Sequence, residues 1–179
     1  MASPSTPERA PGEVRLAADA LVLLVGISGS GKTTFAARHF LPSQVLSSDA
    51  LRAMVADDPN DQSATEAAFE LLHAALTLRL ARRRLTVVDA TNVEHWARQQ
   101  PLSIARRLRR PAVALVFDLP LETCLAHNAV RDAPRPAPAI RRQHRTLRGS
   151  IGALPGEGFE AIWTLTSEEE LNQLRIERS

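Results

Sequence analysis

Three glycines, a lysine and a threonine lie close together near the start of the chain. They are Gly26, Gly29, Gly31, Lys32 and Thr33, in the order Gly-Ile-Ser-Gly-Ser-Gly-Lys-Thr. Glycines let a backbone turn with its N–H groups inward and approach an anion closely, where a Cβ would often clash. The lysine suits the outer phosphates of a nucleoside triphosphate, and the threonine hydroxyl suits Mg²⁺. The pattern therefore predicts a phosphate-binding loop with the contact residues Gly26, Ser28, Gly29, Ser30, Gly31, Lys32, Thr33 and Thr34.

Lys32 is the only lysine of the chain. The sequence has 22 lysine and arginine residues in total, so all the others are arginine. An ammonium is a compact point charge, whereas a guanidinium is a planar fork. The retention of lysine at this one position indicates that a point charge is needed there. This favours phosphate binding over a glycine-rich turn that binds nothing.

Asp49 follows a short apolar stretch at 44–47, and its carboxylate is a candidate general base. Phosphoryl transfer to a hydroxyl needs a carboxylate that takes the proton as the new bond to phosphorus forms. Arg52 lies three residues later, so one helical turn would place its guanidinium on the same side. Such a pair would hold an acceptor that carries both a hydroxyl and a phosphate. The alternative is that Asp49 caps the following helix.

Asp89 ends a second apolar stretch and is a candidate metal ligand together with Thr33. An acidic residue after a buried strand often helps to hold Mg²⁺, directly or through water. The alternative for Asp89 is a cap or turn residue. Asn92 has two interpretations as well, a contact to substrate or a cap of the helix that contains Trp96. We expect Trp96 and Trp163 to pack in the core, because they are too isolated for a platform that stacks several bases.

Arg131 and Arg135 flank a proline-rich segment, which we interpret as a lid at about 131–139. An arginine on a movable lid can neutralise the charge that develops on a transferred phosphoryl group. A strongly basic helix is expected after the lid. Its arginines either line a groove for a nucleotide or oligonucleotide, or form a solvated face. These residues are Arg141, Arg142, Arg145 and Arg148.

Apolar stretches that alternate with helical patterns define the expected fold. The expected strands are 21–25, 44–47, 85–88, 112–117 and 159–165. The expected helices are about 34–40, 50–55, 65–83, 94–108, 121–130 and 140–150, with a terminal helix from 167. Strands that are apolar on both faces and alternate with helices indicate a parallel sheet covered on both sides. Polar residues that follow such strands gather at one edge of the sheet, where ligands bind.

The composition indicates one domain. The chain has 179 residues, of which 44% are hydrophobic, and a formal net charge of +2. We expect a disordered tail over 1–15, which is rich in proline, alanine, serine and glutamate, and a single domain over 16–179. Cys124 is the only cysteine, so a disulfide framework is excluded and a buried thiol is expected. No run of about 18 apolar residues is present, so we expect no membrane partner and a cytoplasmic location.

The order of these motifs resembles the 5′-OH polynucleotide kinase module of bacterial polynucleotide kinase-phosphatase RNA repair enzymes. The similar segments are 26–34, 45–52, 57–65, 85–92, 116–120 and 141–145. The resemblance implies a P-loop NTPase fold of the adenylate-kinase-like kind, with three α/β/α layers, a parallel sheet of about five strands and a lid. It also implies transfer of the γ-phosphate of ATP or another nucleoside triphosphate, with Mg²⁺, to the 5′-hydroxyl ends of RNA or DNA.

The same resemblance implies roles for individual residues. Lys32 and Thr33 correspond to phosphate and metal contacts. Asp49 corresponds to the general base, and Arg52 to the contact with the acceptor's phosphate. The two arginines beside the proline-rich segment correspond to the arginines of the family's lid. Because the three-module repair enzymes continue into phosphatase and ligase regions, partner enzymes of those kinds would act in trans.

Two other functions are compatible with the sequence. A small-molecule kinase of the same fold would act on a sugar, an antibiotic or a nucleotide precursor. It would keep the roles of Lys32 and Asp49, and Arg52 would lose its acceptor role. A nucleotide-dependent regulatory module would use hydrolysis or occupancy as a switch and would need no acceptor site.

Overall fold

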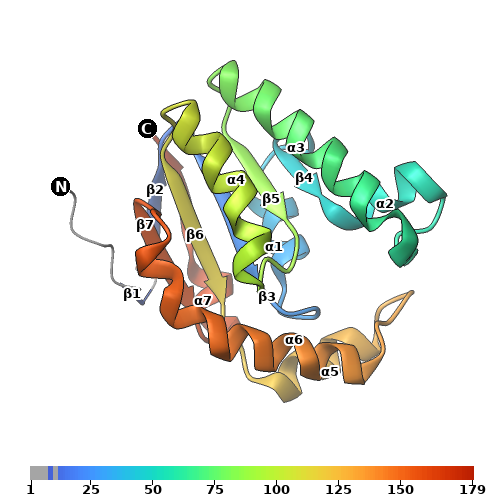
Figure 1. Cartoon of the computed structure of the whole chain (residues 1–179). Helices are drawn as coiled ribbons and strands as arrows, with labels where there is room; N and C mark the ends of the chain where they lie inside the picture. The colour runs from blue at the N-terminus through green and yellow to red at the C-terminus, as the bar shows by residue number, and fades with distance from the viewer. Residues whose placement is uncertain (1–7, 10–11) are drawn as a thin grey trace.

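A parallel sheet runs through the middle of the protein (Figure 1). The computed structural model describes residues 8–9 and 12–179, and within them the sheet has the strand order β1-β7-β6-β3-β5-β4. The five expected strands are all present, and β1 extends one edge by pairing with β7. The strands are β1 (Glu8–Arg9), β3 (Leu21–Gly26), β4 (Val45–Ser47), β5 (Thr86–Asp89), β6 (Ala112–Phe117) and β7 (Ala161–Leu165).

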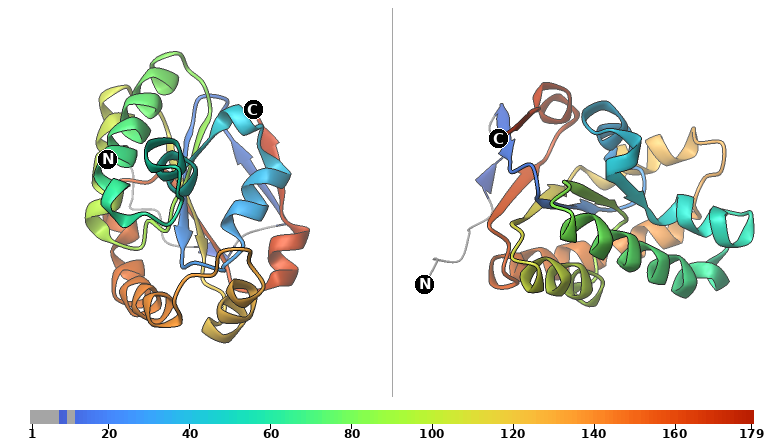
Figure 2. Two further views of the ribbon diagram at one scale, coloured as in Figure 1. Left: turned by 90° about the vertical axis from the view of Figure 1, so that its right-hand side faces the viewer. Right: turned by 90° about the horizontal axis from the view of Figure 1, so that it is seen from above.

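Helices cover both faces of this sheet. Figure 2 shows α3 and α4 on one face and α1 and α7 on the other. Every residue of β3, β5 and β6 is buried, which is the pattern of strands enclosed between two helical layers. The expected three-layer α/β/α fold is therefore confirmed. The helices are α1 (Lys32–His39), α2 (Ser48–Ala56), α3 (Thr65–Ala81), α4 (His95–Arg107), α5 (Leu121–Ala129), α6 (Ala137–Ser150) and α7 (Glu168–Gln173), with 3-10 turns η1 (Pro42–Gln44), η2 (Gln62–Ala64) and η3 (Ile151–Gly156).

The two ends of the domain pair with each other, which the sequence did not lead us to expect. β2 (Glu13–Leu16) and β8 (Arg175–Arg178) form a small parallel sheet. The expected tail is therefore wrong over 8–9, which form β1, and over 13–15, and its stretches 1–7 and 10–11 lie outside the described residues. The expected terminal helix ends at Gln173. Val14 and Leu16 are buried while Glu13 and Arg15 are exposed, which is the alternation of a strand with one buried face.

The lid is shorter than expected, because the following helix begins inside the proline-rich segment. Residues 130–136 connect α5 to α6, and α6 already begins at Ala137. Pro138 lies in the first turn of α6, where its missing N–H has no partner to lose. Pro138 is therefore compatible with the start of α6, so the helix begins within the proline-rich segment and not after it.

The order of the strands determines where ligands can bind. β3 lies between β5 and β6, and β4 lies beyond β5. The segments after β3, β4 and β5 therefore meet at the carboxyl edge of the sheet, where parallel sheets bind ligands. No helix among residues 8–9 and 12–179 is long and apolar enough to span a bilayer.

Candidate active site

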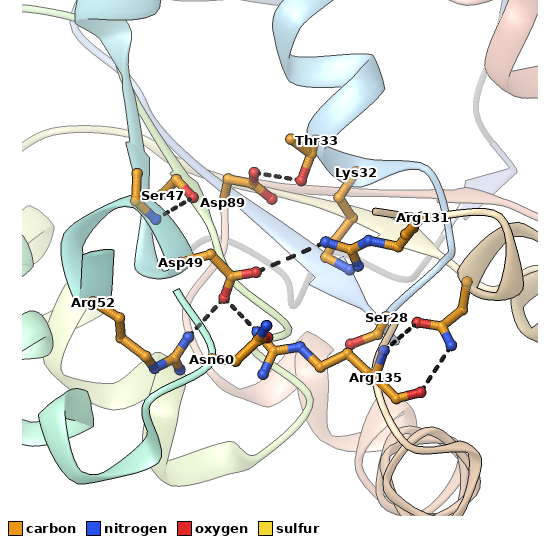
Figure 3. Close-up of polar contacts among 12 residues, drawn as sticks. Ser28, Lys32, Thr33, Ser47, Asp49, Arg52, Asn60, Asp89, Arg131 and Arg135 are labelled. Atoms are coloured by element: carbon orange, nitrogen blue, oxygen red, sulfur yellow. Dashed lines mark hydrogen bonds and ion pairs between the residues drawn. The ribbon is translucent and has the colours of Figure 1, made fainter. Parts of the chain in front are cut away.

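A cleft of about 790 Å³ opens at the carboxyl edge of the sheet. Its walls come from the loop after β3, the start of α2, the segment after β5 and the lid (Figure 3). Most of the expected site residues line it, whereas Gly26 and Ser30 are buried and do not. The expected residues in the wall are Ser28, Gly29, Gly31, Lys32, Thr33, Thr34, Asp49, Arg52, Asp89, Arg131 and Arg135.

The loop over 26–33 has the backbone that its glycines predict. Gly29 and Gly31 have φ values of 82° and 90°, in the left-handed region that only glycine enters at little cost. A Cβ on Gly29 would clash with the backbone carbonyl oxygen of Cys124 in α5. The thiol of Cys124 is buried as expected. The loop is therefore held against α5 at a distance that excludes any side chain.

We expect Gly29→Ala to lower the free energy of unfolding by about 2–4 kcal/mol, because it combines a left-handed φ with a backbone clash. Urea unfolding at equilibrium measures this change. Gly152→Ala is the matched control, because no atom lies within 4 Å of an added Cβ there. A loss no larger than that of the control would contradict the close packing of the loop on α5.

Lys32 is buried at the start of α1, and its ammonium points back into the loop. Nζ donates to the carbonyl oxygen of Ile27 at 2.7 Å and to Oγ of Ser30 at 3.3 Å. Burial lowers the pKa of Lys32 to about 8, although the Asp89 carboxylate opposes this by raising it. The ammonium therefore satisfies the loop's own acceptors and is close enough to the cleft to exchange them for phosphate oxygens.

Thr33 and Asp89 contact each other across the cleft floor (Figure 3). The hydroxyl of Thr33 donates to Oδ2 of Asp89 at 2.8 Å. Burial raises the pKa of the Asp89 carboxyl, while the charge of Lys32 and the hydrogen bond from Thr33 lower it. A hydroxyl and a carboxylate are oxygen ligands of the kind that Mg²⁺ prefers. The donor set therefore fits this cation.

The Asp49 carboxylate lies among three arginines (Figure 3). Its Oδ1 accepts hydrogen bonds from Nη1 of Arg52 at 2.6 Å and from Nη2 of Arg135 at 2.7 Å. Arg131 comes no closer than 4.0 Å, to Oδ2. Both lid arginines thus point at the carboxylate. Oδ2 is the oxygen that remains open to a further hydrogen bond.

Side chains outside the expected set hold these arginines in place. Nε of Arg52 donates to Oγ1 of Thr65 at 3.1 Å. Asn128, in the last turn of α5, accepts from the N–H of Arg135 and donates to its carbonyl oxygen, both at 2.9 Å. The lid is therefore fastened to α5 on one side. No pattern in the sequence marks an asparagine for this task.

Two interpretations of polar residues as helix caps are wrong. The N-cap of α2 is Ser47, whose side chain accepts the capping hydrogen bond, while Asp49 lies in the first turn. The N-cap of α4 is Glu94. Asn92, which is buried, instead donates to the carbonyl oxygen of Leu24 at 2.8 Å. Asn92 therefore ties the segment after β5 to the central strand.

Arg98 also supports the segment after β5, and nothing in the sequence pointed to this role. Its side chain is 0% exposed and donates to the carbonyl oxygens of Asn92 and Val93 and to both carboxylate oxygens of Glu157. The Arg98–Glu157 pair is bidentate, which is the most specific geometry for these groups. A buried arginine cannot be told from an exposed one in a chain so rich in arginine.

The basic helix α6 contributes a glutamine to the cleft. Oε1 of Gln143 accepts from the N–H of Ser28 at 2.9 Å. None of its expected arginines lines the cleft. Arg148 pairs with Asp118 at 2.8 Å, and Arg141 lies 4.0 Å from Glu122. The groove interpretation of these arginines is therefore wrong for this cleft, and they lie at the surface.

Trp96 is not part of the core, so this expectation was wrong. Its side chain is 66% exposed and lines the cleft. Trp163, in contrast, is half-buried and packs against the core as expected. The position of Trp96 in the first turn of α4 places it beside the segment after β5. Spacing along the chain could not distinguish these two tryptophans.

Comparisons with known proteins place the chain in a family and match its fold. A family model described as an AAA domain matches residues 21–154. A chain of the Pnkp1/Rnl/Hen1 RNA repair complex is 25% identical, with a TM-score of 0.63 over 74% of this chain and 45% of that chain. A gluconokinase from Sinorhizobium meliloti 1021 is 17% identical, with a TM-score of 0.55 over 88% and 90% of the two chains. Kti12 from Chaetomium thermophilum, in complex with ADP-AlF3, is 18% identical, with a TM-score of 0.56 over 86% and 94%.

The extent of these matches differs. The chain spans less than half the length of the repair-complex chain. The gluconokinase and Kti12 match over nearly their whole length, at identities that bear on the fold alone. No curated protein sequence matches with significance.

Proposed function

Because the chain belongs to the AAA domain family, we propose that it is a P-loop kinase that transfers the γ-phosphate of ATP, or of another nucleoside triphosphate, to the 5′-hydroxyl end of RNA or DNA. The observation that carries this proposal is the contact between Asp49 and Arg52 in the cleft that also holds Lys32. A carboxylate for a hydroxyl and a guanidinium for a phosphate suit the end of a polynucleotide, which has both groups.

Asp49 is the general base of the proposed reaction. The acceptor hydroxyl gives its proton to Oδ2 of Asp49 while its oxygen forms a bond to the γ-phosphorus. The bond between that phosphorus and the β–γ bridging oxygen breaks, and ADP leaves. Oδ1 keeps its bonds to Arg52 and Arg135, so the two guanidinium groups orient the carboxylate throughout. Within the described part of the chain, Oδ2 has no partner within hydrogen-bond distance that would have to leave before the proton arrives.

The cations around the cleft stabilise the charge of the phosphates. Nζ of Lys32 gives up its hydrogen bond to the carbonyl oxygen of Ile27 and binds phosphate oxygens. The N–H of Ser28 likewise leaves Oε1 of Gln143 and donates to a phosphate oxygen. Nη2 of Arg131 lies 4.0 Å from Oδ2 of Asp49, the oxygen proposed to take the proton. Fixed cations in a partly enclosed site act most strongly where charge develops during the reaction. Nη2 of Arg52 has no partner among the described residues and is proposed to hold the acceptor's phosphate.

Mg²⁺ is part of this proposal. Thr33 and Asp89 would hold it, directly or through water, because they present a hydroxyl and a carboxylate side by side. When bound, the ion would neutralise charge on the outer phosphates of the triphosphate. The residues themselves orient each other by their hydrogen bond.

A place in RNA repair follows from the same proposal. The chain of the Pnkp1/Rnl/Hen1 complex is roughly twice as long as the part that matches here. We propose that this kinase acts beside phosphatase and ligase partners in RNA repair, because the similar chain belongs to an RNA repair complex. Its product, a 5′-phosphate end, is what a ligation reaction consumes.

A small-molecule kinase is the second candidate, and the two contacts of Arg52 favour it. Arg52 is buried and already bound to Asp49 and Thr65, so only part of its guanidinium is open to an acceptor. A sugar or nucleotide precursor with a hydroxyl and no phosphate would need Lys32 and Asp49 alone. A regulatory module is disfavoured, because a switch needs no carboxylate beside the phosphates.

Incubation with γ-labelled ATP, Mg²⁺ and 5′-OH oligonucleotides tests the proposal. We expect label on RNA or DNA with a 5′-hydroxyl and none on strands that already carry a 5′-phosphate. Lys32→Ala is the control for contaminating kinases. Label on gluconate or a nucleoside, with none on any oligonucleotide, would establish the second candidate. Consumption of ATP without any labelled acceptor would contradict both kinases.

A further inference from the structure

Trp96 is the one aromatic side chain of the described residues that is largely exposed. It is 66% exposed, whereas the five phenylalanines and Trp163 are buried or half-buried. Its ring lines the cleft that also contains Asp49 and Lys32. An exposed aromatic ring in the wall of a cleft offers a flat face on which a ligand can stack. The core does not need Trp96, so its explanation lies in the cleft.

The cleft is lined from both faces of the sheet, and Trp96 comes from the same face as α3. Arg38 of α1 and Leu171 and Asn172 of α7 line it from one face. Trp96 of α4 lines it from the other face, which α3 and α4 cover (Figure 2). Arg52 also lines the cleft and belongs to α2, which packs against α3. Trp96 therefore shares the side of the proposed acceptor residues.

Two other apolar side chains line the same cleft. Phe69 of α3 is half-buried against the core. Val130, at the start of the lid, is 85% exposed. The wall of the cleft therefore offers an aromatic face at Trp96 and further apolar groups. Nucleobases bind such faces by stacking, with little dependence on base identity.

We propose that Trp96 stacks on the terminal nucleobase of the acceptor, the base attached to the sugar whose 5′-hydroxyl is phosphorylated. This inference rests on the proposed polynucleotide kinase function and deepens it. Asp49 receives the hydroxyl, Arg52 the next phosphate, and Trp96 the base, so three groups of one nucleotide meet three side chains. The stacking sets the affinity for the acceptor and leaves the chemical step to Asp49.

Steady-state kinetics of Trp96→Ala and Trp96→Phe test this assignment. We expect Trp96→Ala to raise KM for a 5′-OH oligonucleotide about 10-fold, with kcat and KM for ATP within about 2-fold of wild type. Trp96→Phe keeps a stacking face, and we expect it to recover most of the loss. Leu78→Ala is the matched control, because Leu78 is 65% exposed on α3 and lies outside the cleft.

An acceptor without its terminal base gives the sharper comparison. For wild type, we expect an oligonucleotide with a 5′-terminal abasic residue to have a KM about 10-fold higher than the intact strand. Trp96→Ala should not distinguish the two strands. Equal KM values for wild type on both strands, or an unchanged KM in Trp96→Ala, would overturn the stacking role while leaving the kinase intact.

Tryptophan fluorescence provides a readout that needs no catalysis. Addition of a 5′-OH oligonucleotide without ATP should quench the emission of wild type, and the abasic strand should quench it less. The quench should be largely lost in Trp96→Phe, where Trp163 is the remaining fluorophore. Quenching that persists in Trp96→Phe would contradict the proposal. Failure of wild type to phosphorylate any oligonucleotide would instead reject the proposed function itself.

Discussion

Replacement of Asp49 by asparagine is expected to lower kcat for phosphoryl transfer by roughly 10²–10⁴-fold, the range that general base catalysis supplies. An amide keeps the shape of the carboxylate but cannot take the proton of the acceptor hydroxyl. It also removes the charge that Arg52 and Arg135 share through Oδ1. Single-turnover transfer of label to a 5′-OH oligonucleotide at saturating substrates measures the chemical step directly.

Glu122→Gln is the matched control for this experiment. Glu122 faces Arg141 at 4.0 Å and lies outside the cleft, so the same chemical change should leave kcat within about 2-fold. The affinity of the Asp49→Asn variant for ATP, measured by equilibrium binding, should stay close to that of wild type. A kcat near wild type would remove Asp49 as the base. Loss of ATP binding would assign it a structural role.

The sequence was most informative where a short stretch has to make its own local structure. The loop from Gly26 to Thr33 has a backbone that its glycines dictate, so its geometry follows from residue type and order. The apolar strands and the contact between Asp49 and Arg52, one helical turn apart, follow in the same way. Each of these features depends on neighbours within a few residues.

Features that depend on distant packing could not be predicted. Asn128 and Arg98 reach backbone groups of the cleft, and Gln143 lies 115 residues from the N–H that it accepts. Exposure has the same limitation, because Trp96 and Trp163 differ only in what surrounds them in space. The pairing of β2 with β8 joins the two ends of the chain. Helical spacing could not reveal any of these contacts.

The second large effect is expected at Lys32. Lys32→Ala should lower kcat/KM for ATP by roughly 10²–10³-fold, because one fixed charge on the outer phosphates is lost. Lys32→Arg should not restore the activity, since Lys32 is buried and donates to the carbonyl oxygen of Ile27 as a point charge, and a planar fork does not reproduce that geometry. Activity of Lys32→Arg within 10-fold of wild type would show that charge alone is sufficient.

The lowered pKa of Lys32 adds a pH dependence to this prediction. With a pKa of about 8, the side chain is charged below that pH and loses its proton above it. A triphosphate binds the charged form, so the affinity of the protein for ATP should fall about 10-fold between pH 7 and pH 9. Lys32→Ala should lack this component. An equal decline in both proteins would assign the pH dependence to other groups.

The pKa itself can be measured without interference, because the chain contains a single lysine. Lysine labelled with ¹³C at Cε gives one side-chain NMR signal, which should titrate near pH 8 in the free protein. Bound triphosphate should move this midpoint upward, since linkage requires that a ligand which prefers the charged form stabilises it. A midpoint near 10.5 in the free protein would show that the ammonium remains hydrated. The cleft would then bind phosphate without first removing water from its only lysine.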